Sequence, residues 1–326
     1  MTIGTVTLAG SDTTIGKIVF GTMTFGAPVE QDEADRMIRT CLDAGVTMFD
    51  TSNNYVGGRS EEILGKALAG RRESVQIATK CGSMVEQSDP SVVGLSRKAV
   101  SKAIDDSLRR LGTDYIDLYY LHRPDRNTPI EETLEALAEA VAAGKVKALA
   151  QSNFAAWQAT QMLYLSRANG WPEIRVTQMM YNLLARRVET EYVEASRTLG
   201  FTNIAYNPLA GGLLTGKHRR DADPTTGGRF SKAMYRDRYW NDVQFTAIER
   251  LQGIADEAGL TLIELSLRWV LGRPATDAML LGASSIAQLE ANLAAIDGPA
   301  LTDEVLEACD AVWNELLAGV APHYNR

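Results

Sequence analysis

The sequence contains few of the residues that cross-link a chain or hold a metal. Its 326 residues include three cysteines, Cys41, Cys81 and Cys309, and three histidines. The cysteines are odd in number and widely spaced, without a CxxC pair or zinc-ligand spacing, so we expect reduced thiols in a cytoplasmic protein. His218 and His323 lack metal-ligand spacing to each other or to paired carboxylates, and the sequence predicts no metal site.

Long apolar runs and basic blocks are also lacking. No apolar run reaches the roughly 18 residues that a spanning helix needs, and the start, MTIGTVTLAGSD, lacks the basic flank of a signal peptide. Lys and Arg number 33 against 41 Asp and Glu, for a net charge of −8. The densest basic segment, residues 216–223, itself contains acids. We therefore expect neither a nucleic-acid nor a membrane partner.

One alternation is present from end to end. Eight short apolar or β-branched runs begin near residues 17, 46, 75, 116, 146, 176, 202 and 278, and segments of helical period follow them. Several of these segments end in Gly, as a left-handed cap prefers. Eight strand–helix units without a composition break predict an α/β protein, a (β/α)8 TIM barrel forming one domain over residues 1–326. A doubly wound open sheet is the competing fold, which the count of eight disfavours.

Three segments stand outside this count. Residues 5–18 alternate β-formers around a GSDTT turn and predict an N-terminal hairpin. The stretch from residue 207 to about residue 241 predicts a long loop after the seventh strand, and such loops are commonly lids or binding segments. Residues 302–317 predict an extra C-terminal helix. Trp157, Trp269 and Trp313 have spacings typical of core packing, whereas Trp240 belongs to the loop expected to cover the pocket.

Polar side chains follow several of the expected strands. Asp50, Lys80 and His122 end three successive strands, and Tyr55 lies on the loop between two of them. Active sites of such barrels lie at these strand ends. A lysine ammonium next to Tyr55 would lower the phenol pKa from about 10, Asp50 would hold the lysine charged, and His122 would orient a carbonyl oxygen. This set predicts a proton donor for an aldehyde or ketone, but no side chain supplies a hydride.

Two segments indicate a phosphate-bearing cofactor. No GxGxxG follows a strand, which argues against a Rossmann site. Residues 211–218, GGLLTGKH, fit the GxxxxGK spacing, but His218 stands where a magnesium-binding Ser or Thr would be. A glycine-rich loop ending in Lys217 can still lie along a pyrophosphate. Residues 280–293, LLGASSIAQLEANL, place small residues at a helix start, which suits an anion.

These motifs resemble, in order and spacing, those of the aldo-keto reductases. The resemblance runs from GTMTFG at residue 21 to the C-terminus and includes FDTSNNY, RSEEILGKAL, ATK, YYLHRPD, QSNF and YNPLAGGLLTGK. It implies a catalytic tetrad of Asp50, Tyr55, Lys80 and His122, with Tyr55 as the general acid. It also implies reversible, NADPH-dependent reduction of aldehydes or ketones to alcohols.

The resemblance further implies three groups of cofactor-binding residues: around the nicotinamide, along the pyrophosphate and at the adenosine phosphate. The implied set is Gly21, Thr22, Asp50, Ser152, Asn153, Gln178, Asn207, Pro208, Leu209, Gly211, Leu213, Gly216, Lys217, Arg229, Gly282, Ser284, Gln288 and Asn292. One departure concerns cofactor choice. Ala291 stands where relatives often have an acidic residue, and Gln288 occupies a place that is Arg in some branches.

A branch of the family is also indicated. NFAAWQ, NGWP, YNLLARRVETE, NTPIEETL, GRF with YRDRYW, and the terminal HYNR are similar to aflatoxin-aldehyde reductases, a branch that also reduces succinic semialdehyde. The resemblance implies that Tyr235, Arg238 and Arg326 meet a substrate carboxylate beside Tyr55 and His122. The planar guanidinium suits that role because it binds a carboxylate through two hydrogen bonds.

Two other functions stay open at this stage. A Schiff-base aldolase would use Lys80 with a pKa lowered by burial, which Asp50 opposes. A regulatory subunit would bind NADPH and turn over little, as the family's potassium-channel beta subunits do. The sequence leaves open which small carbonyl compound is the substrate, and whether the chain is a monomer or a homo-oligomer.

Overall fold

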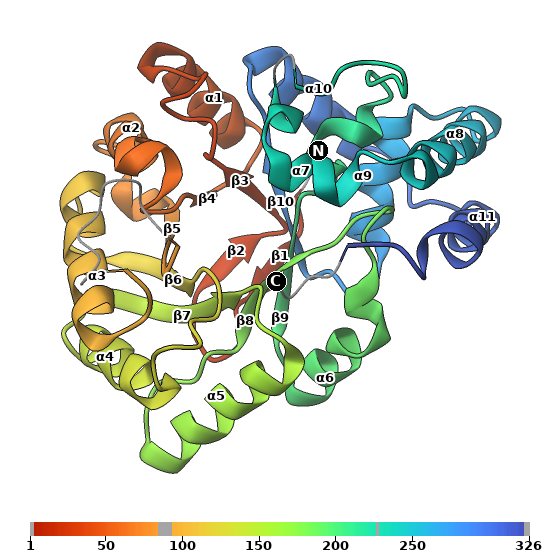
Figure 1. Cartoon of the computed structure of the whole chain (residues 1–326). Coiled ribbons are helices and arrows are strands. Elements are labelled where there is room, and N and C mark those ends of the chain that lie inside the picture. The colour runs from red at the N-terminus through yellow and green to blue at the C-terminus, as the bar shows by residue number, and fades with distance from the viewer. Residues whose placement is uncertain (1–2, 84–92, 226–227, 323–326) are drawn as a thin grey trace.

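A computed structural model describes residues 3–83, 93–225 and 228–322. Eight parallel strands close into a barrel in the order β10-β3-β4-β5-β6-β7-β8-β9, with helices around it (Figure 1). The strands are β3 (Ile18–Gly21), β4 (Met48–Asp50), β5 (Gln76–Cys81), β6 (Ile116–Leu121), β7 (Val146–Ser152), β8 (Val176–Met180), β9 (Thr202–Tyr206) and β10 (Ala278–Gly282). The predicted TIM barrel is confirmed, and each expected strand is present.

Helices connect consecutive strands and cover the outside of the barrel. They are α1 (Gln31–Asp43), α2 (Arg59–Ala67), α3 (Arg97–Leu111), α4 (Ile130–Ala142), α5 (Ala156–Asn169), α6 (Tyr192–Leu199), α8 (Asp242–Glu257), α9 (Leu262–Gly272) and α10 (Ile286–Ile296). Gly112, Gly170 and Gly200 end α3, α5 and α6 with positive φ angles of 64°, 66° and 69°. These glycines reverse the chain into the following strand, as expected of left-handed caps.

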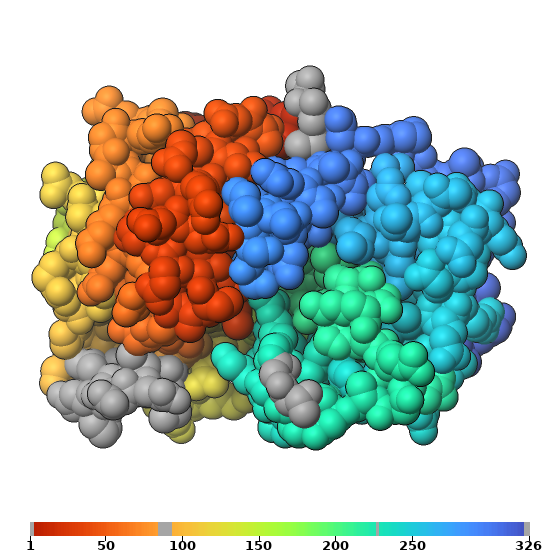
Figure 2. Space-filling view, turned by 90° about the horizontal axis from the view of Figure 1, so that it is seen from above, coloured from red at the N-terminus to blue at the C-terminus, as the bar shows by residue number. Residues whose placement is uncertain are grey.

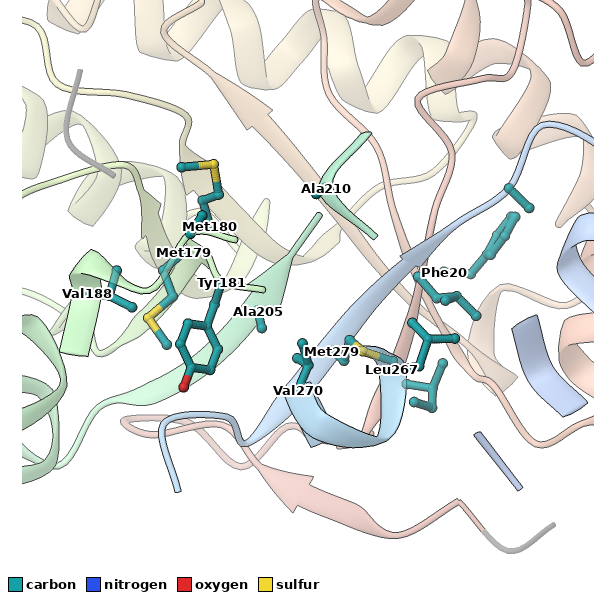
Figure 3. Packing of buried hydrophobic residues seen from close by; sticks show 14 of the residues in the cluster. Phe20, Met179, Met180, Tyr181, Val188, Ala205, Ala210, Leu267, Val270 and Met279 are labelled. Atoms are coloured by element: carbon teal, nitrogen blue, oxygen red, sulfur yellow. The ribbon is translucent and has the colours of Figure 1, made fainter. Parts of the chain in front are cut away.

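The strands bury both of their faces, so the protein has an inner and an outer core. The inner core fills the barrel with side chains such as Met48, Leu118 and Ile204. The outer core lies between strands and helices, where Leu267 and Val270 of α9 face Met279 of β10 (Figure 3). Continuous burial of parallel strands explains why their sequences read as unbroken apolar runs.

The predicted N-terminal hairpin closes one end of the barrel. Strands β1 (Thr5–Thr7) and β2 (Thr14–Gly16) pair antiparallel. Leu8 and Ile15 of this hairpin are each 1% exposed and belong to the inner core. The hairpin therefore seals the end opposite to the one at which Asp50, Lys80 and Ser152 finish their strands.

The stretch from residue 207 to residue 241 is more structured than the expected loop. It contains the short turns η5 (Ala210–Thr215) and η6 (Arg229–Ser231) and the helix α7 (Ala233–Tyr239). Phe230 and Trp240 meet edge-on at a centroid distance of 5.1 Å, and Trp240 meets Phe245 of α8 edge-on, also at 5.1 Å. In Figure 2 this green-to-cyan segment lies beside the blue α10. Its aromatic residues, which sequence periodicity does not reveal, join the outer core.

The remaining expectations concern the C-terminal helix, the tryptophans and the cysteines. Helix α11 (Asp303–Val312) and the turn η7 (Trp313–Leu317) confirm the extra helix. Trp269 and Trp313 are buried as expected. The prediction that Trp157 packs in the core is wrong, because its side chain on α5 is 64% exposed. The three cysteines are buried and unpaired. Among the described residues, no helix is long and apolar enough to cross a membrane.

Candidate active site

The strand ends bring Asp50 and Lys80 together at the open end of the barrel. Asp50 is the last residue of β4 and lies beside Ala78 of β5, two residues before Lys80. Lys80 Nζ contacts Asp50 Oδ1 and donates to the carbonyl oxygen of Thr51 at 2.7 Å. Both side chains are buried, so the charges are paired away from water.

Burial and pairing act in opposite directions on this pair. Burial raises the pKa of Asp50 and lowers the pKa of Lys80, while the contact between the two groups opposes both shifts. Gln178 on β8 also donates to Asp50 Oδ2 at 2.9 Å, so both carboxylate oxygens have a partner. The ion pair is thus fixed by three strands of the barrel.

Tyr55 lies above this ion pair at the start of the turn η1 (Tyr55–Gly58). Lys80 Nζ is 5.2 Å from the centroid of the Tyr55 ring, and the ring meets His122 edge-on at 6.0 Å. The expected lowering of the Tyr55 pKa is wrong. Burial, followed by the charge of Asp50, raises that pKa well above its ordinary value. The phenol therefore keeps its proton at neutral pH and is a donor.

His122 follows β6 and faces the same point. Its backbone N–H donates to the carbonyl oxygen of Cys81 at 2.8 Å, which ties the residue to β5. Burial, then the charges of Lys80 and Arg123, lower the pKa of His122 to about 3. The imidazole is therefore neutral at physiological pH and can offer one N–H to a carbonyl oxygen.

Amide and hydroxyl groups line the next strand ends. Ser152 ends β7, and Asn153, with a positive φ of 64°, donates to Ser152 Oγ at 3.0 Å and to the carbonyl oxygen of His122 at 2.9 Å. Tyr206, the last residue of β9, donates to Asn153 Oδ1 at 2.7 Å. Sequence reasoning missed Tyr206, although its place at a strand end, one residue before Asn207, was a usable signal.

The segment after β9 forms a tight strap. Asn207 has a φ of 63°, accepts a bond from Gly211 N at 2.6 Å, and donates to Tyr239 Oη at 2.9 Å. Leu213 is 1% exposed and Pro208 is also buried, so these two residues anchor the strap in the core. Leu209 and Gly211 are half-buried, while Gly216 and Lys217 are exposed beyond them.

The start of α10 lies beside this strap (Figure 2). Ser284 and Gln288 bond each other, since Gln288 Oε1 accepts from the Ser284 backbone and hydroxyl at 3.0 Å and 2.8 Å. Gly282 and Ser284 are exposed. Asn292 is 6% exposed and donates weakly to the carbonyl oxygen of Gly282 at 3.4 Å. Ser285, rather than Ser284, is the residue that caps the helix.

Gly21 and Thr22 support the site from β3. A Cβ at Gly21 would lie 2.6 Å from Leu280 Cδ2, so a side chain there would require the Leu280 side chain to shift. Thr22 is fully buried and its hydroxyl donates to the carbonyl oxygen of Asp50 at 3.1 Å. The Thr22 side chain therefore holds the end of β4 in place.

Three cations, Lys217, Arg229 and Arg238, lie on the strap and the segment up to the end of α7. Arg229 lies 5.7 Å from the ring of Tyr235 and acts against the rise in the Tyr55 pKa. Arg238 likewise acts against the rise in the Tyr206 pKa. In the part of the chain that the structure describes, Lys217, Arg229 and Arg238 form no ion pair. Arg326 lies outside the described residues.

This donor set fits an anionic, phosphate-bearing group. Cations without carboxylate partners, an exposed helix start and a strap of positive-φ backbone suit phosphate oxygens. The amides of Asn153 and Gln178 at the strand ends suit a polar ring carboxamide. The tetrad expected from the sequence is thus gathered in one place, whereas the strap and the helix start are separate surfaces beside it.

Comparisons with known proteins agree with this architecture. Residues 17–314 match the family model described as Aldo/keto reductase family. The chain is 36% identical over 326 residues to Aflatoxin B1 aldehyde reductase member 2 of Rattus norvegicus, covering 94% of this chain and 87% of the relative. It is 36% identical to human Aldo-keto reductase family 7 member A3, over 94% and 96%. It is also 33% identical to a probable voltage-gated potassium channel subunit beta of Oryza sativa, over 94% and 95%.

Proposed function

Since the chain belongs to the aldo/keto reductase family, we propose that it reduces aldehydes or ketones to alcohols with NADPH, and that Tyr55 is the general acid. The observation that carries this proposal is the placement of Tyr55, Lys80, Asp50 and His122 at one end of the barrel. Membership of the family makes the protein an oxidoreductase that acts on carbonyl groups. The cofactor supplies the hydride that no side chain can provide.

Each member of the tetrad has a separate task. His122, neutral and held against β5, donates from one ring nitrogen to the carbonyl oxygen and orients it. Tyr55 keeps its proton because burial raises its pKa, and it gives that proton to the oxygen as negative charge develops there. An alkoxide is a stronger base than a phenolate, so the transfer is favourable late in the reaction. Lys80 stabilises the phenolate that remains, and Asp50 holds Lys80.

The cofactor would bind along the strap and the start of α10. Lys217 would meet the pyrophosphate, and Arg229 would meet the extra phosphate that distinguishes NADPH from NADH. Ser152, Asn153 and Gln178 would surround the nicotinamide. Gln288 and Asn292 would hold the adenosine end, although Ser284 and Gln288 must first release each other.

The substrate class follows from the cations that remain. Arg238 is half-buried near the opening, without an ion-pair partner in the described ranges. Together with Tyr235 it suits a small aldehyde that bears a carboxylate. The rat relative, Aflatoxin B1 aldehyde reductase member 2, is named for a different carbonyl, aflatoxin B1 aldehyde. A site with a carboxylate-binding arginine and aromatic walls suits both acidic aldehydes and dicarbonyls.

The proposal is tested by following loss of reduced-nicotinamide absorbance with succinic semialdehyde, an uncharged aromatic aldehyde, a diketone and a sugar aldehyde. Each is supplied with NADPH and with NADH. Turnover with NADPH that is strongest on the acidic aldehyde, and weaker in Arg238→Ala, supports the whole proposal. Turnover spread evenly over uncharged carbonyls would support the proposed reductase activity and contradict the role of Arg238 in binding a substrate carboxylate.

Two other functions have distinct outcomes in the same assay. Tight NADPH binding with no turnover on any carbonyl would favour a regulatory subunit. The similarity to a probable potassium channel subunit beta motivates this alternative. Borohydride trapping of a substrate on Lys80 would favour an aldolase. The full burial of Lys80 and its bonds to Asp50 and the Thr51 carbonyl argue against that nucleophile, because Nζ has no open approach.

A further inference from the structure

A buried hydroxyl lies between His122 and a neighbouring amide. Ser52, fully buried in the turn between Asp50 and Tyr55, places its Oγ 3.2 Å from His122 Nδ1. The same Oγ donates to Asn54 Oδ1 at 2.7 Å. Its other neighbour is the carbonyl oxygen of Lys80, at 3.5 Å. One hydroxyl therefore bridges the catalytic imidazole and an amide, and the reaction described above makes no use of it.

The hydroxyl has a single proton, and this limits the forms of the histidine. A neutral imidazole holds its hydrogen on either Nδ1 or Nε2. When Ser52 donates to Asn54, its oxygen is left to accept from Nδ1–H of His122, and Nε2 has no hydrogen. When Ser52 donates to Nδ1 instead, the hydrogen of His122 is on Nε2. The partner of the Ser52 proton thus selects the tautomer.

Carbonyl reduction requires only one of these forms. A carbonyl oxygen accepts hydrogen bonds and donates none, so His122 must present Nε2–H to it. A half-turn of the Asn54 amide about its last side-chain bond exchanges Oδ1 for Nδ2 without moving any other group. Nδ2 then donates to Ser52 Oγ, and the Ser52 proton goes to His122 Nδ1.

We propose that Ser52 and Asn54 are positioning residues that keep the hydrogen of His122 on Nε2, through a chain from Asn54 Nδ2 to Ser52 Oγ to His122 Nδ1. The consequence for catalysis rests on the proposed carbonyl reduction, whereas the tautomer itself does not. Neither residue touches the substrate; both act through the imidazole ring. Burial, followed by the charges of Lys80 and Arg123, lowers the pKa of His122 and keeps that ring neutral, which is the condition under which a tautomer can be selected.

The first test is spectroscopic and needs no substrate. The protein is labelled with ¹⁵N-histidine, and the ring nitrogens of His122 are recorded at pH 8.5 with oxidised cofactor bound. His218→Gln and His323→Gln variants assign the other two rings. Wild type is expected to show a protonated Nε2 and a bare Nδ1. Asn54→Asp offers only acceptors to Ser52, so it is expected to reverse the two nitrogens, whereas Asn54→Ala, which offers Ser52 neither a donor nor an acceptor, is expected to give a mixture of the two forms.

Ser52→Ala removes the bridge and is expected to give a mixture of the two forms. The proposal is overturned if wild type and Asn54→Asp show the same tautomer, or if Ser52→Ala keeps the single wild-type form. A variant that fails to fold leaves the other two to decide the question. An Asn54 that served only to shape the turn would give no difference in tautomer between Asn54→Asp and Asn54→Ala.

The second test links the tautomer to turnover. Asn54→Asp is expected to lower kcat about 100-fold, the usual loss for one hydrogen-bond donor to a reacting oxygen, and to lower it more than Asn54→Ala does. The cofactor Kd is measured in parallel. Equal losses of kcat in the two variants would contradict the proposal. If wild type reduces no carbonyl, the proposed function fails, while the nitrogen spectra still test the selection of the tautomer.

Discussion

At the scale of single residues, the central feature is a buried ion pair whose two charges depend on each other. Lys80→Met would leave the Asp50 carboxylate buried with only Gln178 as its side-chain partner. Removing one partner of such a pair costs about 3–5 kcal/mol, whereas replacing both with neutral groups costs much less. We expect the double variant Asp50→Asn/Lys80→Met to be more stable than Lys80→Met alone.

Urea unfolding of the two single variants and the double variant measures this coupling. If the losses in free energy of unfolding of the two single variants add up to the loss in the double variant, the two groups act independently. In that case the ion pair would not be what holds the ends of β4 and β5 together. All of these variants are expected to lose turnover, because Tyr55 depends on the charge of Lys80.

His122 makes the folded protein sensitive to acid. Its pKa falls to about 3 on folding, from an ordinary value of 6.5. Between these two values the unfolded state binds a proton on His122 and the folded state does not. The folded protein therefore has its full stability above pH 6.5 and loses part of it as the pH falls towards 3. His122→Gln is expected to lose less stability than wild type between pH 7 and pH 4, measured by urea unfolding at each pH. If the free energy of unfolding of wild type and of His122→Gln changes with pH in the same way, His122 is not neutral and buried in the folded protein.

Much of the site was predictable at this scale, because strand ends in a barrel converge. Asp50, Lys80 and His122 were identified from their positions after three apolar runs, and Tyr55 from the loop between them. The direction of the Tyr55 pKa was not predictable, since it depends on how deeply the ring is buried and on the nearby Asp50. The contact of Ser52 with His122 joins residues 70 positions apart, which no local pattern reveals.

At the scale of elements, the strap after β9 is expected to set cofactor choice. Arg229→Ala removes a cation that forms no ion pair among the described residues and that would meet the extra phosphate of NADPH. A charge-assisted hydrogen bond contributes about 1.5–3 kcal/mol, so the Kd for NADPH is expected to rise roughly tenfold or more. The Kd for NADH is expected to stay nearly the same.

Fluorescence titration of both cofactors checks this, with Arg219→Ala as the matched control. Arg219 lies on the same segment but is paired with Asp221 on an exposed surface. A parallel loss of affinity for NADPH and NADH in Arg229→Ala would mean that Arg229 meets a part common to both. An equal loss of NADPH affinity in Arg219→Ala would show that the effect comes from the overall charge of the segment and not from Arg229 itself.

Helices α2 and α3 approach so closely that one position between them must be glycine. A Cβ at Gly65 would lie 2.4 Å from the carbonyl oxygen of Leu111, a backbone atom that cannot move aside by itself. Gly65→Ala is therefore expected to destabilise the protein by about 1–3 kcal/mol. Gly253 on α8 meets nothing within 4 Å, so Gly253→Ala should stabilise by about 0.5–1 kcal/mol. Urea unfolding compares the pair, and the same sign of change in both would contradict this packing.

Element prediction worked best where periodicity was strong. The eight strands and the helices between them follow from apolar runs and glycine caps, because a parallel strand is buried on both faces. The stretch from residue 207 to residue 241 was predicted as a loop, although α7 and a cluster of aromatic rings lie within it. Its apolar residues join the outer core from short separate turns, so they give no long period. Trp157 was misplaced because α5 exposes aromatic residues that its composition makes look like core.

At the scale of the whole molecule, the barrel separates stability from chemistry. The hairpin and the inner core close one end with apolar side chains such as Leu8 and Ile15, while the other end gathers polar groups. The strap and the start of α10 lie beside that polar end, and Lys217, Arg229 and Arg238, which form no ion pair within the described ranges, lie on the strap and the segment up to the end of α7. This division explains why the eight strand–helix units in the sequence predict the fold. Substrate and cofactor preference are expected to depend instead on segments outside these units, such as the strap and α7.

The measurement that tests the central claim most directly compares wild type with Tyr55→Phe. NADPH binding is followed by fluorescence, and turnover by loss of reduced-nicotinamide absorbance with the best carbonyl of the panel. Because only the proton donor is removed, turnover is expected to fall by roughly 100-fold or more, while the Kd for NADPH stays close to that of wild type. Turnover in Tyr55→Phe close to that of wild type would contradict the account, since the proton would then come from another group.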